Sequence, residues 1–325
     1  MRVVDASIQW PRSGAVPDWV VDASDCDGMM GAAELMLNVS RFDIGRLKAF
    51  RRFMEADRRM KEVVQVCAKV VCIASGKGGT GKSILASNLA SARAHAGERV
   101  LLIDFDAGLA NAHLLLGLAP AHDMGDVLAG RVKVHQALVE GPGGLHLLSG
   151  GVGRPALANP TRRELDRLFK LLQPLESEYD LIVIDHGAGM SYGTVTHLAA
   201  TSTLMLVTNP EITALSDAYA LYKRAHMVNS EIRVGLVLNR AHDEQEAESA
   251  WERFQSVSQR FLGHQPEWIG WVPFDHAVRA SVQRRTPVTP DCAAAHALRN
   301  VARWAPLDHA RTSRPFYERA RKALR

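Results

Sequence analysis

Two lysines lie within one glycine-rich loop of this 325-residue chain. The loop fits the pattern G-x-x-x-x-G-K-[ST] and consists of Gly76, Lys77, Gly78, Gly79, Thr80, Gly81, Lys82 and Ser83. Glycines allow backbone N–H groups to surround a phosphate, and the helix that follows directs further free N–H groups at the same anion. Lys82 is expected to neutralise the β- and γ-phosphates of a nucleotide, and the Ser83 hydroxyl to bind Mg²⁺. The motif predicts a nucleoside-triphosphate site, with a chance glycine-rich turn as the alternative, and leaves Lys77 without a role.

Acidic residues follow two of the apolar runs that are expected to form strands. LLIDFDAGLAN carries Asp104 and Asp106, and LIVIDHGAGMS carries Asp185. A carboxylate at the end of a strand can hold Mg²⁺ through water, and Asp185 is predicted to do so. Asp106 lies in a glycine-containing loop, so we expect it to orient the attacking water and to contribute to the metal site. Gly187 and Gly189 would let backbone amides approach the γ-phosphate. Each aspartate could instead cap a helix, and for Asp104 this interpretation has equal weight.

The elements that must position these residues alternate along the chain. Short apolar runs predict strands at 69–75, 99–104, 145–150, 180–185, 203–208, 233–239 and 268–272. Helical segments are expected at 82–96, 162–176, 212–228 and 243–262. Most of the strand runs are continuously apolar, which is typical of strands covered on both faces. The pattern predicts an α/β fold with a doubly wound, mostly parallel sheet and helices on both faces. Ligands of such sheets bind at the carboxyl ends of the strands.

Composition adds two expectations. The net charge of +4 is too small to predict nucleic-acid binding by itself, but eight Arg and Lys oppose two acidic residues between Arg299 and Arg325. No apolar leader follows Arg2, so no signal peptide is expected. The spacing of the cysteines suggests neither a zinc site nor a disulfide framework, so reduced thiols in the cytoplasm are expected for Cys26, Cys67, Cys72 and Cys292.

The glycine-rich loop resembles the deviant Walker A motif of the MinD/ParA ATPases, and the likeness extends from about residue 68 to 305. The signature lysine of that family corresponds to Lys77. In the family, two subunits enclose two ATP molecules, and each signature lysine reaches the nucleotide of the other subunit. The resemblance implies a homodimer formed with ATP, in which Lys77 acts in trans in the manner of an arginine finger. It also implies slow ATP hydrolysis with Lys77, Lys82 and Asp106 as the catalytic residues.

Within that family several segments are similar to FlhG, a regulator of flagellar number and position. They are the segments 104–153 and 207–223 and the motif IDHGAGMS. LVLNR (236–240) resembles the strand that recognises adenine, which implies base contacts by Asn239 and Arg240. Segment 272–288 resembles the segment that follows, in which Pro273 and the loop after it flank the base. The resemblance implies control of flagellar number or placement, with an FlhF-type GTPase or a flagellar C-ring protein as partner.

Two departures from the family pattern are visible. His186 stands where a small hydroxyl residue is common, and we expect its side chain to be exposed in a loop. Residues 1–66 contain no clear copy of the N-terminal helix that activates the GTPase FlhF.

Three regions are expected. Residues 1–66 form an N-terminal extension, partly disordered, with one charged helix at about 43–64. Residues 67–305 form the ATPase domain, and 306–325 a basic tail. At helical spacing one apolar face of the tail comprises Phe316, Tyr317, Ala320, Ala323 and Leu324. This helix could bind an anionic membrane through residues 313–325, which would place the protein at the inner face of the cell membrane; the alternatives are a helix docked on the domain and a frayed end.

Other functions fit parts of the pattern. A ParA-like partition ATPase would bind DNA non-specifically in its ATP form, using Arg279, Arg284 and Arg285. A metallocluster protein of the same fold would need cysteines after the strands that carry Asp106 and Asp185, and none of the four occurs there. A scaffold that binds ATP without hydrolysis is disfavoured by the presence of both aspartates.

Overall fold

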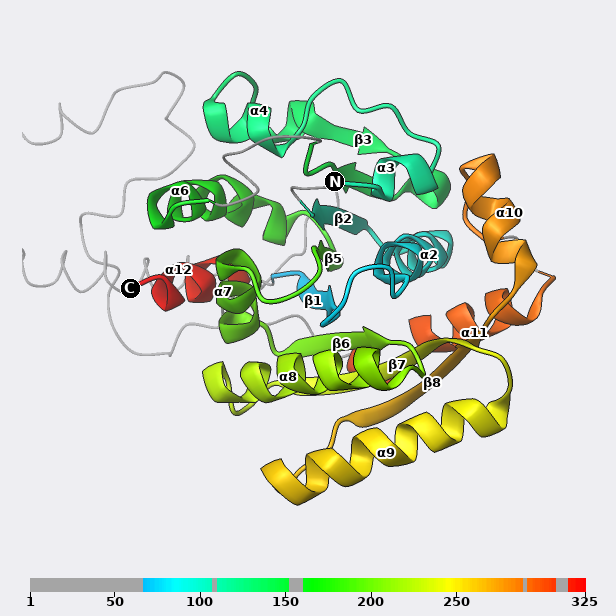
Figure 1. Ribbon diagram of the computed structural model, residues 1–325. Helices are drawn as coiled ribbons and strands as arrows, with labels where there is room; N and C mark the ends of the chain where they lie inside the picture. The colour runs from blue at the N-terminus through cyan, green and yellow to red at the C-terminus, as the bar shows by residue number, and fades with distance from the viewer. Residues whose placement is uncertain (1–66, 107–109, 152–159, 289–290, 308–314) are drawn as a thin grey trace, which may run out of the picture. The chain divides into compact units, whose positions relative to one another are not determined.

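A computed structural model describes residues 67–106, 110–151, 160–288, 291–307 and 315–325. The expected N-terminal extension, with its charged helix at 43–64, lies outside the described residues, as does part of the tail. The described chain is built on one eight-stranded sheet with the order β3-β4-β2-β5-β1-β6-β7-β8 (Figure 1). Every neighbouring pair is parallel except β3 and β4, which are antiparallel. This confirms the predicted fold class.

Seven of the eight strands of this sheet coincide with the apolar runs predicted from the sequence. The strands are β1 (Lys69–Ala74), β2 (Val100–Phe105), β3 (Leu138–Glu140), β4 (His146–Leu148), β5 (Leu181–His186), β6 (Thr203–Thr208), β7 (Arg233–Ala241) and β8 (Glu267–Pro273). The central strands β5 and β6 are buried along their whole length, as expected for strands with helices on both faces. The short edge strand β3 was not predicted, because three residues carry too little periodicity to be distinguished from a loop.

The helices cover both faces of the sheet. They are α2 (Lys82–His95), α3 (Ala112–Leu115), α4 (Met124–Ala129), α6 (Arg162–Leu172), α7 (Tyr192–Ala200), α8 (Ile212–Val228), α9 (Glu244–Leu262), α10 (His276–Arg284), α11 (Ala293–Ala302) and α12 (Phe316–Ala323). The helix expected at 162–176 ends earlier and continues as a 3₁₀ helix, η5 (Gln173–Ser177), because Pro174 cannot donate a helical hydrogen bond. None of the described helices combines the length with the apolar composition of a membrane-spanning segment.

Two hydrophobic cores result, one on each side of the sheet. Helices α4, α6, α7, α8, α9 and α12 bury their apolar sides against one face. Helices α2, α3 and α11 cover the other face. Each strand sends alternate side chains into the two cores: in β1, Cys72 belongs to the first core and Ile73 to the second. The sheet is thereby covered on both faces, and it positions the loops at its carboxyl edge.

The C-terminal helix α12 is docked on the domain. Phe316, Tyr317 and Ala320 are completely buried, and Leu324 is 4% exposed. The backbone N–H groups of Phe316 and Tyr317 donate to the buried carboxylate of Glu176 in η5. The sequence allowed a membrane-binding helix, a docked helix or a frayed end, and the structure shows the docked helix. The apolar face of α12, which was expected to be free, is buried against the domain. The physical reason is that two large aromatic side chains fill the core between α6 and α7.

Candidate nucleotide-binding site

The glycine-rich loop joins β1 to α2, as its sequence predicts. Its glycines have a steric purpose: a Cβ on Gly76 would lie 2.1 Å from the carbonyl oxygen of Asp217, and one on Gly81 would lie 2.1 Å from the side-chain nitrogen of Asn239. Gly79 and Gly81 also have positive φ angles of 77° and 91°. At the end of the loop Lys82 is 6% exposed, while Lys77 has 45% of its side chain exposed. The two lysines therefore occupy different environments.

The aspartate at the end of β5 faces the loop from the neighbouring strand. Asp185 is completely buried, and neither carboxylate oxygen has a hydrogen-bond partner among the described residues. Burial raises the pKa of Asp185 to about 6, whereas the Lys82 ammonium and the Ser83 hydroxyl lower it. A buried carboxylate with free oxygens beside a hydroxyl and an ammonium is a donor set that fits Mg²⁺ and a bound phosphate.

The two aspartates after β2 have different surroundings. Asp104 is buried and accepts hydrogen bonds from the backbone N–H groups of Asp106 and Ala112, at 3.1 and 3.0 Å. Asp104 thus holds the loop and the start of α3 from within β2, whereas the N-cap position of α3 is occupied by Asn111. Burial, followed by the charge of Asp185, raises its pKa to about 8. Asp106 is half-buried, and a Cβ on Gly187 would lie 3.4 Å from its carboxylate, so the loops after β2 and β5 meet here.

His186 was predicted to be exposed, and this prediction is wrong. It is the last residue of β5 and is completely buried. Its ring packs on His197 of α7 with 5.1 Å between ring centroids, and on Phe105 at 5.9 Å. Burial, with a smaller contribution from Lys82, lowers its pKa to about 3, so the ring is neutral. The strand continues one residue beyond Asp185, and its alternation turns His186 into the core.

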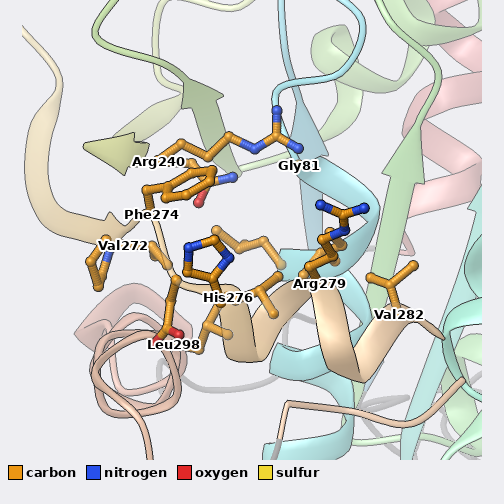
Figure 2. A pocket seen from close by; sticks show the side chains of 14 residues that line it. Gly81, Arg240, Val272, Phe274, His276, Arg279, Val282 and Leu298 are labelled. Atoms are coloured by element: carbon orange, nitrogen blue, oxygen red, sulfur yellow. The ribbon is translucent and has the colours of Figure 1, made fainter. Parts of the chain in front are cut away.

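A cavity of about 390 Å³ adjoins the loop and is lined mainly by apolar side chains (Figure 2). It lies between the end of β7, the end of β8, and helices α2 and α10. Asn239, Arg240 and Pro273 all line it, as the adenine assignment requires. The Asn239 side chain also donates to the Thr80 carbonyl at 2.6 Å, which joins the cavity to the phosphate loop.

The resemblance implied that the loop after Pro273 flanks the base, but it singled out no residue of that loop beyond Pro273. Phe274, His276 and Arg279 follow β8 and line the cavity in Figure 2. Phe274 is 54% exposed although it is aromatic, which suits a surface that a flat base would cover. Its position directly after Pro273 in an apolar strand was the available signal. Arg279, which the DNA-binding interpretation also uses, is one of the residues that line this cavity.

Lys77, the candidate for the signature lysine, contacts residues at the start of α8. The Lys77 ammonium lies 3.3 Å from Thr213 Oγ1 and 3.8 Å from a carboxylate oxygen of Glu211, at the start of α8. Gly189, predicted near the γ-phosphate, donates its backbone N–H to the Ser75 carbonyl at 3.0 Å and so borders the loop. The structure thus gathers the predicted residues at the carboxyl edge of β1, β2, β5, β7 and β8.

A glycine-rich loop with a buried lysine, facing buried carboxylates at the ends of neighbouring parallel strands, defines a P-loop nucleoside-triphosphatase. Comparison with known proteins agrees. Residues 68–238 match the family described as "AAA domain". The chain is 33% identical to the antiactivator FleN of Pseudomonas aeruginosa over 220 residues, which are 68% of this chain and 79% of that protein.

Solved structures extend the comparison to the fold. The cell division ATPase MinD of Pyrococcus furiosus superimposes with a TM-score of 0.62 at 27% identity, covering 73% of this chain and 97% of that one. MinD of Pyrococcus horikoshii, solved with Mg-ADP, gives a TM-score of 0.60 at 28% identity over 72% of this chain and 94% of its own. The chain belongs to the MinD/ParA family of P-loop ATPases and shares in particular the features of its flagellar members of the FlhG type.

Proposed function

We propose that this protein is an ATP-driven dimerisation switch that hydrolyses ATP slowly, and only as a dimer. The proposal rests on the different solvent exposure of the two lysines in the loop. Lys82 is buried beside Asp185, whereas Lys77 stands half-exposed at the rim, where a second copy can approach it. Three large apolar side chains near the loop support the same contact: Ile212, Met190 and Tyr192 are 74%, 50% and 47% exposed.

The roles proposed for the site follow from position and charge. Lys82 and the backbone N–H groups of the loop would bind the β- and γ-phosphates. Ser83, Asp185 and Asp106 would hold Mg²⁺, which neutralises phosphate charge when bound. Asp106 would also orient the attacking water, because its half-buried carboxylate borders the loop that contains Gly187. Lys77 from the second copy would stabilise the charge that develops at the γ-phosphate.

Adenine would occupy the cavity beside the loop. One N–H of the Asn239 side chain donates to Thr80, which leaves its second N–H and its oxygen for the base, and the oxygen as acceptor suits the amino group of adenine. Arg240 and Pro273 would border the ring, and Phe274 would cover it. A base bound in this cavity would affect the position of the phosphate loop through the hydrogen bond between Asn239 and Thr80.

In the cell we propose control of flagellar number or placement, the role that the resemblance to FlhG implies and that the name of a Helicobacter pylori relative, the flagellum site-determining protein YlxH, suggests for that protein. An FlhF-type GTPase or a flagellar C-ring component is the proposed partner. Residues 67–305 would provide the switch, and residues 1–66 a separate extension.

Peripheral membrane association is proposed through residues 313–325. Because Phe316 and Tyr317 are buried in the domain, α12 must leave its groove before its apolar face can meet a bilayer. Pelleting with vesicles that contain anionic lipid, with and without ATP, tests this proposal. Deletion of 313–325 should abolish pelleting, and equal pelleting of the shortened chain would refute the assignment.

The decisive experiment compares the two lysines. Lys82→Ala should lose nucleotide binding, whereas Lys77→Ala should still bind ATP but neither dimerise nor hydrolyse it. Sedimentation velocity with ATP and Mg²⁺, with ADP and without nucleotide measures pairing, and phosphate release measures turnover. If Lys77→Ala dimerises with ATP as well as the wild type, the action of Lys77 in trans is refuted.

A further inference from the structure

The Lys77 ammonium has partners within its own subunit. Glu211 immediately precedes α8 and Thr213 is its second residue, and both side chains lie within 4 Å of Lys77 Nζ, at 3.8 and 3.3 Å. The side chains of Lys77 and Glu211 are 45% and 63% exposed. The contact is therefore formed at the surface, where a second molecule can compete for the same ammonium.

The backbone around Lys77 is held firmly. Ser75 Oγ donates to the Lys77 carbonyl at 2.7 Å, and the Ser75 carbonyl accepts from Gly189 at 3.0 Å. Gly76 lies against α8 so closely that any Cβ there would collide with the Asp217 carbonyl. Because the loop cannot shift easily relative to α8, Lys77 can reach a new partner only by rotation of its side chain.

We propose that Glu211 and Thr213 form a holding site for the Lys77 ammonium in the single subunit, and that this contact breaks when Lys77 engages the nucleotide of a second copy. This inference rests on the proposed function, in which Lys77 acts in trans. A carboxylate of the same subunit and a triphosphate of the other compete for one cation. The holding site thus opposes pairing and sets the ATP concentration at which dimers form.

The expected size of the effect follows from exposure. A solvent-exposed ion pair changes an equilibrium constant by about 1.4- to 5-fold. Two lysines must be released for each dimer, and the two factors multiply. Loss of both holding sites should therefore raise the dimer association constant by about 2- to 30-fold.

The test uses the full chain with Glu211→Gln, which keeps the shape of the side chain and removes its charge. Sedimentation velocity with ATP and Mg²⁺ should show the increase in association constant. Asp217→Asn is the matched control, because it removes an equal charge from α8 itself and leaves Glu211 and Thr213, the partners of Lys77, in place. An unchanged or lower association constant for Glu211→Gln, or an equal increase for Asp217→Asn, overturns the proposal.

A second measurement does not depend on dimer formation. Acetylation of Lys77 by acetic anhydride, followed by mass spectrometry without nucleotide, should be faster in Glu211→Gln than in the wild type. Thr213→Val should change both readouts in the same direction, and Thr213→Ser should restore wild-type values. If the wild type never dimerises with ATP, the proposed function fails, while the acetylation rate still decides whether the holding site exists. Equal acetylation rates in all variants refute it.

Discussion

Acidification should destabilise this protein through a buried histidine. His197 in α7 is completely buried, and neither ring nitrogen has a hydrogen-bond partner among the described residues. Its ring packs on Phe105, Phe169 and Phe316, with centroids 4.6, 4.9 and 5.3 Å away. Burial, followed by the neighbouring His186, holds the pKa of His197 well below its ordinary value. The ring therefore stays neutral in the folded protein under mildly acidic conditions.

The sign and size of the effect follow from linkage. In the unfolded chain a histidine takes up a proton near pH 6.5, whereas the folded protein excludes it. The unfolded state thus binds more protons below this pH, and stability is lost as the pH falls. Between pH 7 and pH 5 the loss amounts to about 2 kcal/mol for one such histidine. Buried carboxyls with raised pKa values, such as Asp104, act in the opposite direction, so the histidine must be isolated by comparison of variants.

The comparison uses His197→Leu, which removes the titrating ring at similar volume. Urea unfolding at pH 7 and pH 5, without nucleotide, should show that the wild type loses about 2 kcal/mol more than the variant over this interval. The quantity compared is the pH dependence, so a change in absolute stability at pH 7 does not disturb it. The exposed His242→Leu serves as control and should follow the wild type. Parallel losses in wild type and His197→Leu would show that the neutral buried ring is not the cause.

Three further results are expected. Lys82→Ala should abolish the rise in melting temperature that ATP and Mg²⁺ cause, because the phosphates lose their buried cation. Asp106→Ala should bind ATP and accumulate as a dimer while phosphate release falls by at least about tenfold; retained turnover would exclude Asp106 from water positioning. Glu176→Ala should lower the free energy of unfolding by about 2–3 kcal/mol in urea titrations, since the buried N–H groups of Phe316 and Tyr317 lose their acceptor.

Much of the fold and of the phosphate site could be predicted because it depends on short-range patterns. The strand before Gly76 and the helix after Lys82 are encoded in contiguous residues, and the motif between them has few other uses. The aspartates at the ends of β2 and β5 were identified for the same reason, since an apolar run that ends in a carboxylate is visible locally. The adenine side was predicted only in part: resemblance indicated Asn239, but Phe274 emerged only when β8 and α10 were placed beside the loop.

The amino-acid sequence is sufficient to identify this chain as an α/β P-loop protein, because the loop, its flanking elements and its carboxylates are properties of contiguous segments. Which side chains are withdrawn from water depends instead on contacts between segments that are distant in the chain. His186 is buried because β5 runs between β1 and β2 and its alternation directs that ring toward α7. The face of α12 that resembled a membrane anchor is buried because Phe316 and Tyr317 pack into the core beside α6 and α7, and Glu176, distant in sequence, accepts hydrogen bonds at the start of this helix. Lys77 contacts Glu211 for a similar reason, because the pairing of β1 with β6 brings α8 beside the loop. Contacts between neighbouring strands of this kind cannot be predicted from the periodicity of a single segment.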